Sequence, residues 1–180
     1  MNSTDTTTAH GRILSIEVRS RKVGYAVVDR RKYLVDWGIR TFVAPENTLS
    51  HRKMSVLLSS FRPCTILVSG MSGRDHRNEE TVRLLIALVR RQARPLSILV
   101  KTISKLSIKA HFAKNGQLSK HEIAGVVVSA FPELGWHMPR KRKAWQSESS
   151  AQLIFDAVAL IIVHLARTET SVVWSAPGDE

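Results

Sequence analysis

The stretch ILSIEVRSRKVGYAVVDRRKYLVDWGIRTF, residues 13–42, decides the fold class of this 180-residue chain. It holds three short runs rich in β-branched and aromatic residues, over residues 13–18, 23–29 and 32–42. Such runs are typical of strands, and four residues or fewer separate each run from the next. Strands this close in sequence pair as hairpins, so the stretch predicts a three-stranded antiparallel meander.

The pattern beyond residue 42 alternates between helical and strand-like segments. Apolar residues at helical spacing predict helices, and short apolar runs predict strands. In chain order we expect a helix over 50–61, a strand over 65–70, a helix over 79–94, a buried strand over 96–103, and helices over 104–113, 119–131 and 151–166. This order of elements predicts an α/β layout with a mixed sheet.

The basic charge of the chain is concentrated in its central part. There are 27 Lys and Arg against 15 Asp and Glu, which gives a formal net charge of +12. We expect a disordered arm over 1–11, one folded domain over 12–167 and an acidic tail over 168–180, and neither end carries a Lys or Arg. The positive charge therefore belongs to the folded domain, which favours a polyanionic partner, nucleic acid before a membrane.

The same composition excludes several classes of protein. A single cysteine, Cys64, excludes an intramolecular disulfide framework and a cysteine-rich zinc site, and we expect it in the core. The N-terminus has no apolar segment typical of a secretory signal, and no apolar run is long enough to span a bilayer. We therefore expect a cytoplasmic protein with no membrane partner.

Two carboxylates stand in strongly apolar surroundings. Glu17 lies inside the first strand, and Asp156 lies inside the last helix, in FDAVALIIVHL. An ionised carboxylate is unfavourable there unless it is paired, hydrogen-bonded or bound to a metal. One interpretation is a site for Mg²⁺ or Mn²⁺ that hydrolyses phosphodiester bonds, with Glu17 and Asp156 as metal ligands. The other is that each is an ordinary buried acid, satisfied by an arginine or by the backbone.

Three segments resemble, in order, the ribonuclease H-like superfamily, and most closely the RuvC-type Holliday junction resolvases. They are residues 13–42, the pair Asn115-Gly116 followed by SKHE at 119–122, and FDAVAL at 155–160. The resemblance implies a ribonuclease H-like α/β fold, with a five-stranded mixed β-sheet (three antiparallel strands, then two parallel ones) flanked by helices. It also implies a metal-dependent, structure-selective endonuclease that cleaves branched DNA in recombination and repair, and a homodimer.

The chain departs from this pattern at the carboxylates. The resemblance implies four of them: one on the first strand, one at the end of the fourth strand and two on the last helix. Glu17 stands where Asp is usual, and no carboxylate stands at residues 68–69. The last helix keeps Asp156, but Gln152 and Leu153 stand one turn earlier. Glu148, eight residues before Asp156, is the candidate for a substitute third catalytic ligand.

Three functions remain open at this point. The chain is a divergent nuclease that uses Glu17, Asp156 and Glu148, or a catalytically degenerate relative that binds DNA or RNA without cutting it. A third hypothesis is an assembly module whose dimer interface lies on the apolar helix surfaces at 82–89 or 123–128. Steep salt dependence of nucleic-acid binding would argue against the third.

Clusters of basic residues are the candidates for contact with nucleic acid. They are Arg19, Arg21, Lys22, Lys114, Lys120, Arg140, Lys141, Arg142 and Lys143. Contacts to phosphates position a duplex without choosing a sequence, which suits recognition by shape. Trp136 and Trp145 flank the last four, where their indoles could stack on bases.

Overall fold

The opening 30 residues of the domain form the antiparallel meander that their sequence predicts. In a computed structural model of the chain, the strands are β1 (Ile13–Arg19), β2 (Lys22–Val28) and β3 (Leu34–Thr41). The structure describes residues 11–29, 31–42, 47–70, 76–113, 116, 118–141, 143, 145 and 147–173. Of the expected arm over 1–11, only residue 11 is described. Of the expected tail over 168–180, residues 168–173 are described, and they belong to the last helix.

Two further strands complete a five-stranded mixed sheet. They are β4 (Thr65–Ser69) and β5 (Leu99–Ile103), and the order across the sheet is β3-β2-β1-β4-β5. β1 is central: it pairs antiparallel with β2, with Glu17 opposite Gly24, and parallel with β4. β4 pairs parallel with β5. The predicted arrangement of three antiparallel strands followed by two parallel ones is confirmed.

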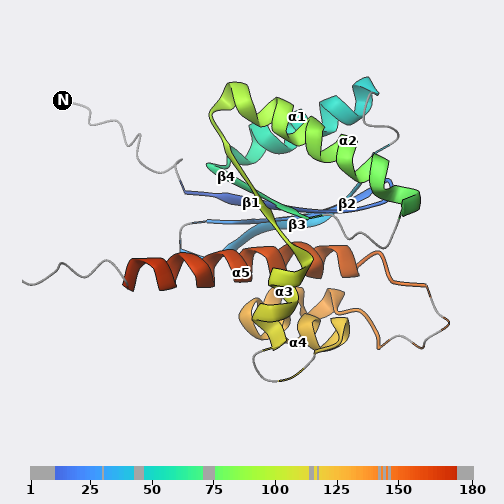
Figure 1. Cartoon of the computed structure of the whole chain (residues 1–180), viewed down its shortest axis with the longest axis vertical. Helices are drawn as coiled ribbons and strands as arrows, with labels where there is room; N and C mark the ends of the chain where they lie inside the picture. The colour runs from blue at the N-terminus through green and yellow to red at the C-terminus, as the bar shows by residue number, and fades with distance from the viewer. Residues whose placement is uncertain are drawn as a thin grey trace, which may run out of the picture.

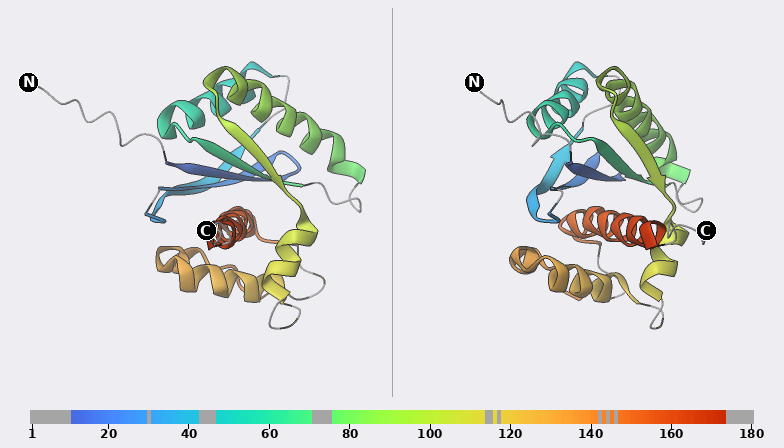
Figure 2. Two further views of the ribbon diagram at one scale, coloured as in Figure 1. Left: turned by 60° about the vertical axis from the view of Figure 1, so that its left-hand side comes forward. Right: turned by 90° about the vertical axis from the view of Figure 1, so that its left-hand side faces the viewer.

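Helices cover both faces of this sheet (Figure 1). In chain order they are α1 (Thr48–Phe61), α2 (His76–Ala93), the short 3-10 helix η1 (Arg94–Leu96), α3 (Lys105–Phe112), α4 (Lys120–Ala130), the 3-10 helix η3 (Pro132–His137) and α5 (Gln152–Val173). α1 and α2 lie on one face, and α5 lies across the other. The left view of Figure 2 shows α5 nearly end-on, between the sheet and α4.

Strand alternation divides the core into two clusters. Leu14, Ile16 and Val18 of β1 belong to the cluster under α1 and α2. Since successive side chains of a strand point to opposite faces, Ser15 and Glu17 point toward α5. The second cluster lies there, and it extends from α5 into α3, α4 and η3. Glu17 is thus the acidic residue of β1 on the face that α5 covers.

Two expectations about burial are wrong. β5 is an edge strand whose Leu99 is 53% exposed, because helices do not enclose it as they enclose β1. Cys64 is exposed as well, because it precedes β4 in the turn that follows α1. No helix among the described residues is both long and apolar enough to cross a membrane.

A close approach between α5 and β2 fixes the position of the last helix. A Cβ atom added at Gly24 would lie 2.4 Å from the backbone oxygen of Leu153. Real Cβ atoms do not come so near to backbone, so only glycine permits this contact. We expect Gly24→Ala to lower the free energy of unfolding by about 1–3 kcal/mol through overpacking, as measured by urea unfolding.

Gly125→Ala is the matched control for this substitution. Its added Cβ would meet only Met138 Cε, at 3.9 Å, and Gly125 lies inside α4. Here alanine should raise stability by about 0.5–1 kcal/mol, because it restricts the unfolded chain. A Gly24→Ala protein as stable as wild type would show that α5 does not approach β2 this closely.

Candidate functional site

Glu17 is a buried carboxylate at the carboxyl end of the central strand. It is 6% exposed. Its Oε1 lies 3.9 Å from Lys105 Nζ, and Ser69, at the end of β4, acts on its pKa. Burial, helped by the nearby charge of Asp156, raises the pKa of Glu17 from 4.5 to about 7, against the opposing effects of Ser69, Lys105 and Arg19. The side chain is therefore largely protonated below neutral pH.

Asp156 faces Glu17 from the first turns of α5. Its Oδ2 accepts a hydrogen bond from Arg19 Nη2 at 2.9 Å and lies 3.5 Å from Lys120 Nζ. Its Oδ1 accepts a hydrogen bond from Gln152 Nε2 at 2.9 Å. Both carboxylate oxygens are thus engaged by nitrogen donors. The two acids singled out in the sequence do converge, since the charge of Asp156 acts on Glu17.

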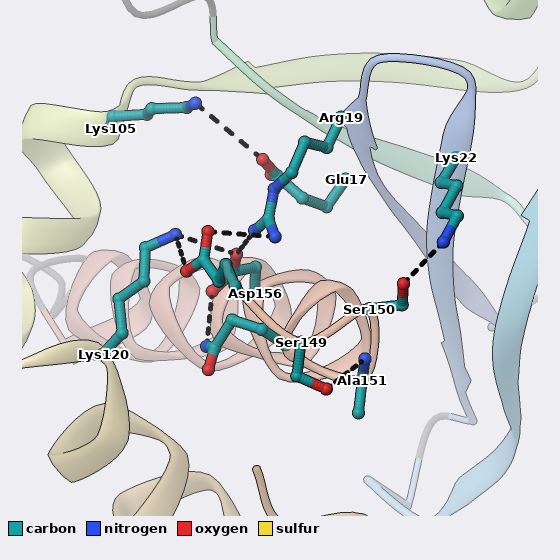
Figure 3. A network of polar contacts seen from close by, with 11 residues as sticks. Glu17, Arg19, Lys22, Lys105, Lys120, Ser149, Ser150, Ala151 and Asp156 are labelled. Carbon is teal, nitrogen blue, oxygen red and sulfur yellow. Dashed lines mark hydrogen bonds and ion pairs between the residues drawn. The ribbon is translucent and has the colours of Figure 1, made fainter. Parts of the chain in front are cut away.

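Glu148, in the segment before α5, joins the same group of charges. Its Oε2 lies 3.0 Å from Arg19 Nη1, and its Oε1 lies 2.6 Å from Lys120 Nζ. Arg19 and Lys120 therefore each bridge Glu148 and Asp156. Figure 3 shows Arg19 and Lys120 reaching Asp156. We call Glu148 and Asp156, together with the Arg19 and Lys120 side chains that bridge them, the bridged pair of carboxylates.

Local sequence explains how the two lysines reach the site. Lys105 and Lys120 are the first residues of α3 and α4, and each follows a serine whose side chain caps its helix. The Ser119 cap is reciprocal, because Glu122 in turn accepts a hydrogen bond from the Ser119 backbone amide at 2.7 Å. Such caps define where a helix begins, and so they fix the positions of both lysines.

The described residues do not fit a divalent-metal centre. Among them, no group of three or more His, Cys, Asp or Glu side chains is arranged to hold a metal ion. Ser69 ends β4 in place of a carboxylate, and Gln152 donates an amide N–H toward the site where an acid would offer an oxygen. The remaining oxygens of Asp156 and Glu148 already face Arg19 and Lys120.

Two adjoining grooves open beside the bridged pair. One, of about 800 Å³, lies between the start of α4 and residues 139–152, and Lys120, Arg140 and Lys141 line it. The other, of about 440 Å³, lies along the β1–β2 turn, and Arg19, Arg21 and Lys22 line it. Glu148 lines both grooves. Six basic side chains therefore surround one shared carboxylate.

Other predicted contacts are less well placed, or fall outside what is described. Lys114 and Arg142 lie outside the described residues. Lys143 is exposed, with its Nζ 5.5 Å from the centre of the Trp145 ring. Trp136 and Trp145 are 97% and 80% exposed, so both indoles are accessible.

Sequence reasoning missed three participants in the site. Ser69 and Gln152 were noted only as absent carboxylates, yet Gln152 donates a hydrogen bond to Asp156 and Ser69 lowers the pKa of Glu17. Lys105 has a signal that could have identified it, since a serine cap places it at a helix start after the edge strand. Nothing in the linear sequence indicates that Arg19 pairs with two acids far along the chain.

The raised pKa of Glu17 predicts how stability depends on pH. The folded state keeps a proton that the unfolded state loses above pH 4.5, so stability should fall as pH rises from about 4.5 through about 7. The total loss should be about 3 kcal/mol. In EDTA, urea unfolding of Glu17→Gln should show this slope removed and should exceed wild-type stability at pH 8.

Glu133→Gln, at an exposed position in η3, is the control and should keep the wild-type slope. A wild-type protein with no loss of stability across this window would show that Glu17 is ionised throughout.

Comparison with known proteins places the fold. No protein-family model matches the sequence, and a search of curated proteins finds no relative. Among solved structures, RuvC of T. thermophilus in complex with Holliday junction substrate is 20% identical, with a TM-score of 0.64 over 88% of this chain and 96% of that chain.

Two further resolvases are similar in structure. The yeast mitochondrial Holliday junction resolvase Ydc2 is 14% identical, with a TM-score of 0.51 over 88% of this chain and 81% of that chain. The fowlpox virus Holliday junction resolvase is 11% identical, with a TM-score of 0.52 over 87% and 99%. At these identities the likeness concerns the fold. The chain therefore has the ribonuclease H-like fold of the RuvC-type resolvases.

Proposed function

We propose that this protein binds branched DNA across the two adjoining grooves and recognises the shape of its backbone. One observation carries the proposal: six basic side chains line the two grooves around a single shared carboxylate. A groove lined by one sign of charge attracts a polyanion, and phosphate contacts hold DNA without reading its bases. The net charge of +12 supports the same class of partner.

The basic side chains in the grooves differ in how available they are. Arg19 and Lys120 are engaged with Glu148 and Asp156. In the part of the chain that the structure describes, Arg21 and Arg140 lie on the groove walls with no carboxylate at ion-pair distance. Lys22 donates only to the Ser150 hydroxyl, at 2.7 Å. These three are the cations we assign to phosphates.

The division into two grooves favours a branched ligand over a straight one. The segment from Ser147 to Ser150 contributes side chains to both grooves. A ligand that fills both must therefore present phosphates on two sides of this segment, as the diverging strands of a junction do. Solved structures of similar fold, from T. thermophilus and fowlpox virus, are complexes with Holliday junction DNA. A homodimer and a role in recombination or repair belong to the same proposal.

Hydrolysis of the bound DNA is a second candidate function. The observation in its favour is that the charges of Glu17 and Asp156 act on each other, so the two acids do approach. Against it stand the missing carboxylate at Ser69 and the two cations on Asp156. Binding without cleavage is therefore the function we favour.

Salt dependence tests the proposed binding. We expect the affinity for a four-way junction, measured by fluorescence anisotropy from 50 to 300 mM salt, to fall steeply for wild type. Arg21→Gln/Arg140→Gln should reduce the log–log slope by about 2, because each lost phosphate contact removes about 0.9. Arg52→Gln/Arg94→Gln carries the same charge change on exposed residues of α1 and η1, and should keep the wild-type slope. Equal slopes for both double variants, or equal affinity for junction and linear duplex, would contradict the proposal.

A cleavage assay separates the two candidates. Labelled junction is incubated with wild type and with Asp156→Asn, in Mn²⁺ and in EDTA. We expect both proteins to shift the junction in a gel and neither to cut it. Cutting in Mn²⁺ that EDTA and Asp156→Asn both abolish would establish the nuclease instead.

A further inference from the structure

Two side-chain cations occupy the space between the carboxylates of the site. Arg19 and Lys120 make four contacts to Glu148 and Asp156, at 2.6–3.5 Å. Each cation touches both acids, so neither belongs to a simple ion pair. The acids are only 27% and 19% exposed at their side chains. Leaving either of them unpaired there would be unfavourable.

The charges in this group balance. Two carboxylates carry two negative charges, and one guanidinium with one ammonium supplies two positive charges. A divalent cation would supply the same charge from a single point. The two bridging side chains therefore neutralise the charge of the two acids, as a divalent metal ion would otherwise do.

We infer that Arg19 and Lys120 are the resident cations of this site, and that they hold Glu148 and Asp156 together without a divalent ion. The inference concerns the free protein, so it does not depend on the proposed DNA binding. The positions of these acids are set by the protein's own charges.

Geometry explains why the wild-type site would resist a metal ion. Mg²⁺ binds carboxylate oxygens at about 2.0–2.1 Å and needs open directions around them. Arg19 approaches Oδ2 of Asp156, Lys120 approaches the same atom, and Gln152 occupies Oδ1. Two cationic groups at 2.9 and 3.5 Å would also repel an incoming divalent ion. Removing both cations takes away these four contacts and the charge that repels a divalent ion, so we expect the two acids to bind one.

The test measures the response of the folded protein to Mn²⁺ alone. Thermal unfolding and titration calorimetry are run for wild type and for Arg19→Gln/Lys120→Gln, in EDTA and in 1 mM Mn²⁺. We expect wild type to show no Mn²⁺-dependent shift and no binding heat. The double variant should melt lower in EDTA and recover in Mn²⁺, with one ion bound per chain and at least a tenfold gain in affinity over wild type.

Controls keep the result interpretable. Arg52→Gln/Arg94→Gln makes the same change of net charge away from the site and should acquire no response to Mn²⁺. If the double variant does not fold in EDTA, the single variant Arg19→Gln is compared with Arg19→Lys, which keeps the charge. Only Arg19→Gln should then gain Mn²⁺ binding. Mn²⁺ binding by wild type as tight as by the variant, or a variant with unchanged stability and no metal binding, would overturn the inference. Loss of junction binding alone would bear only on the proposed function.

Discussion

The seating of α5 on the sheet at Gly24 is the constraint on which the site depends. Gly24 pairs with Glu17 across β1 and β2, and the absence of its Cβ lets the backbone of Leu153 come down onto the strand. One turn later the same helix presents Asp156. The same cross-strand pair therefore contains the buried acid, Glu17, and the glycine against which α5 packs, Gly24. Any residue larger than glycine at position 24 would lift Asp156 away from the acid it faces.

With the helix packed on the sheet, the chemistry of the site depends on the charges that surround its acids. Burial weakens the ionisation of Glu17, while Asp156 and Glu148 each meet two cations from the same chain. The fold thus matches that of the resolvases, while the acids of this site are paired with cations of the chain itself. Similar structures at 10–20% identity fix the path of the backbone and leave the chemistry to individual side chains.

Much of the fold could be predicted from the sequence because its signals are local. Strand alternation, short turns and serine caps each depend on a few adjacent residues, and β1, α3 and α4 follow them closely. The need of Glu17 and Asp156 for partners was also predictable, since an ionised acid in an apolar run is unfavourable alone. The identity of those partners was not predictable. In the sequence Arg19 is one of many basic residues, and only the fold brings α5 beside it. The exposure of Leu99 was missed for a related reason: an apolar run does not reveal which strand lies at the edge.

The bridged pair also bears on how the chain folds. Arg19 and Asp156 are 137 positions apart, and their contact closes a loop that contains nearly the whole domain. Contacts of such high order form only after the intervening elements have docked, because the entropy of closing the loop must first be overcome. The meander and the capped helices can form early from neighbouring residues. We therefore expect the ion pairs of the site to form late in folding, once the first strand and the last helix have packed together.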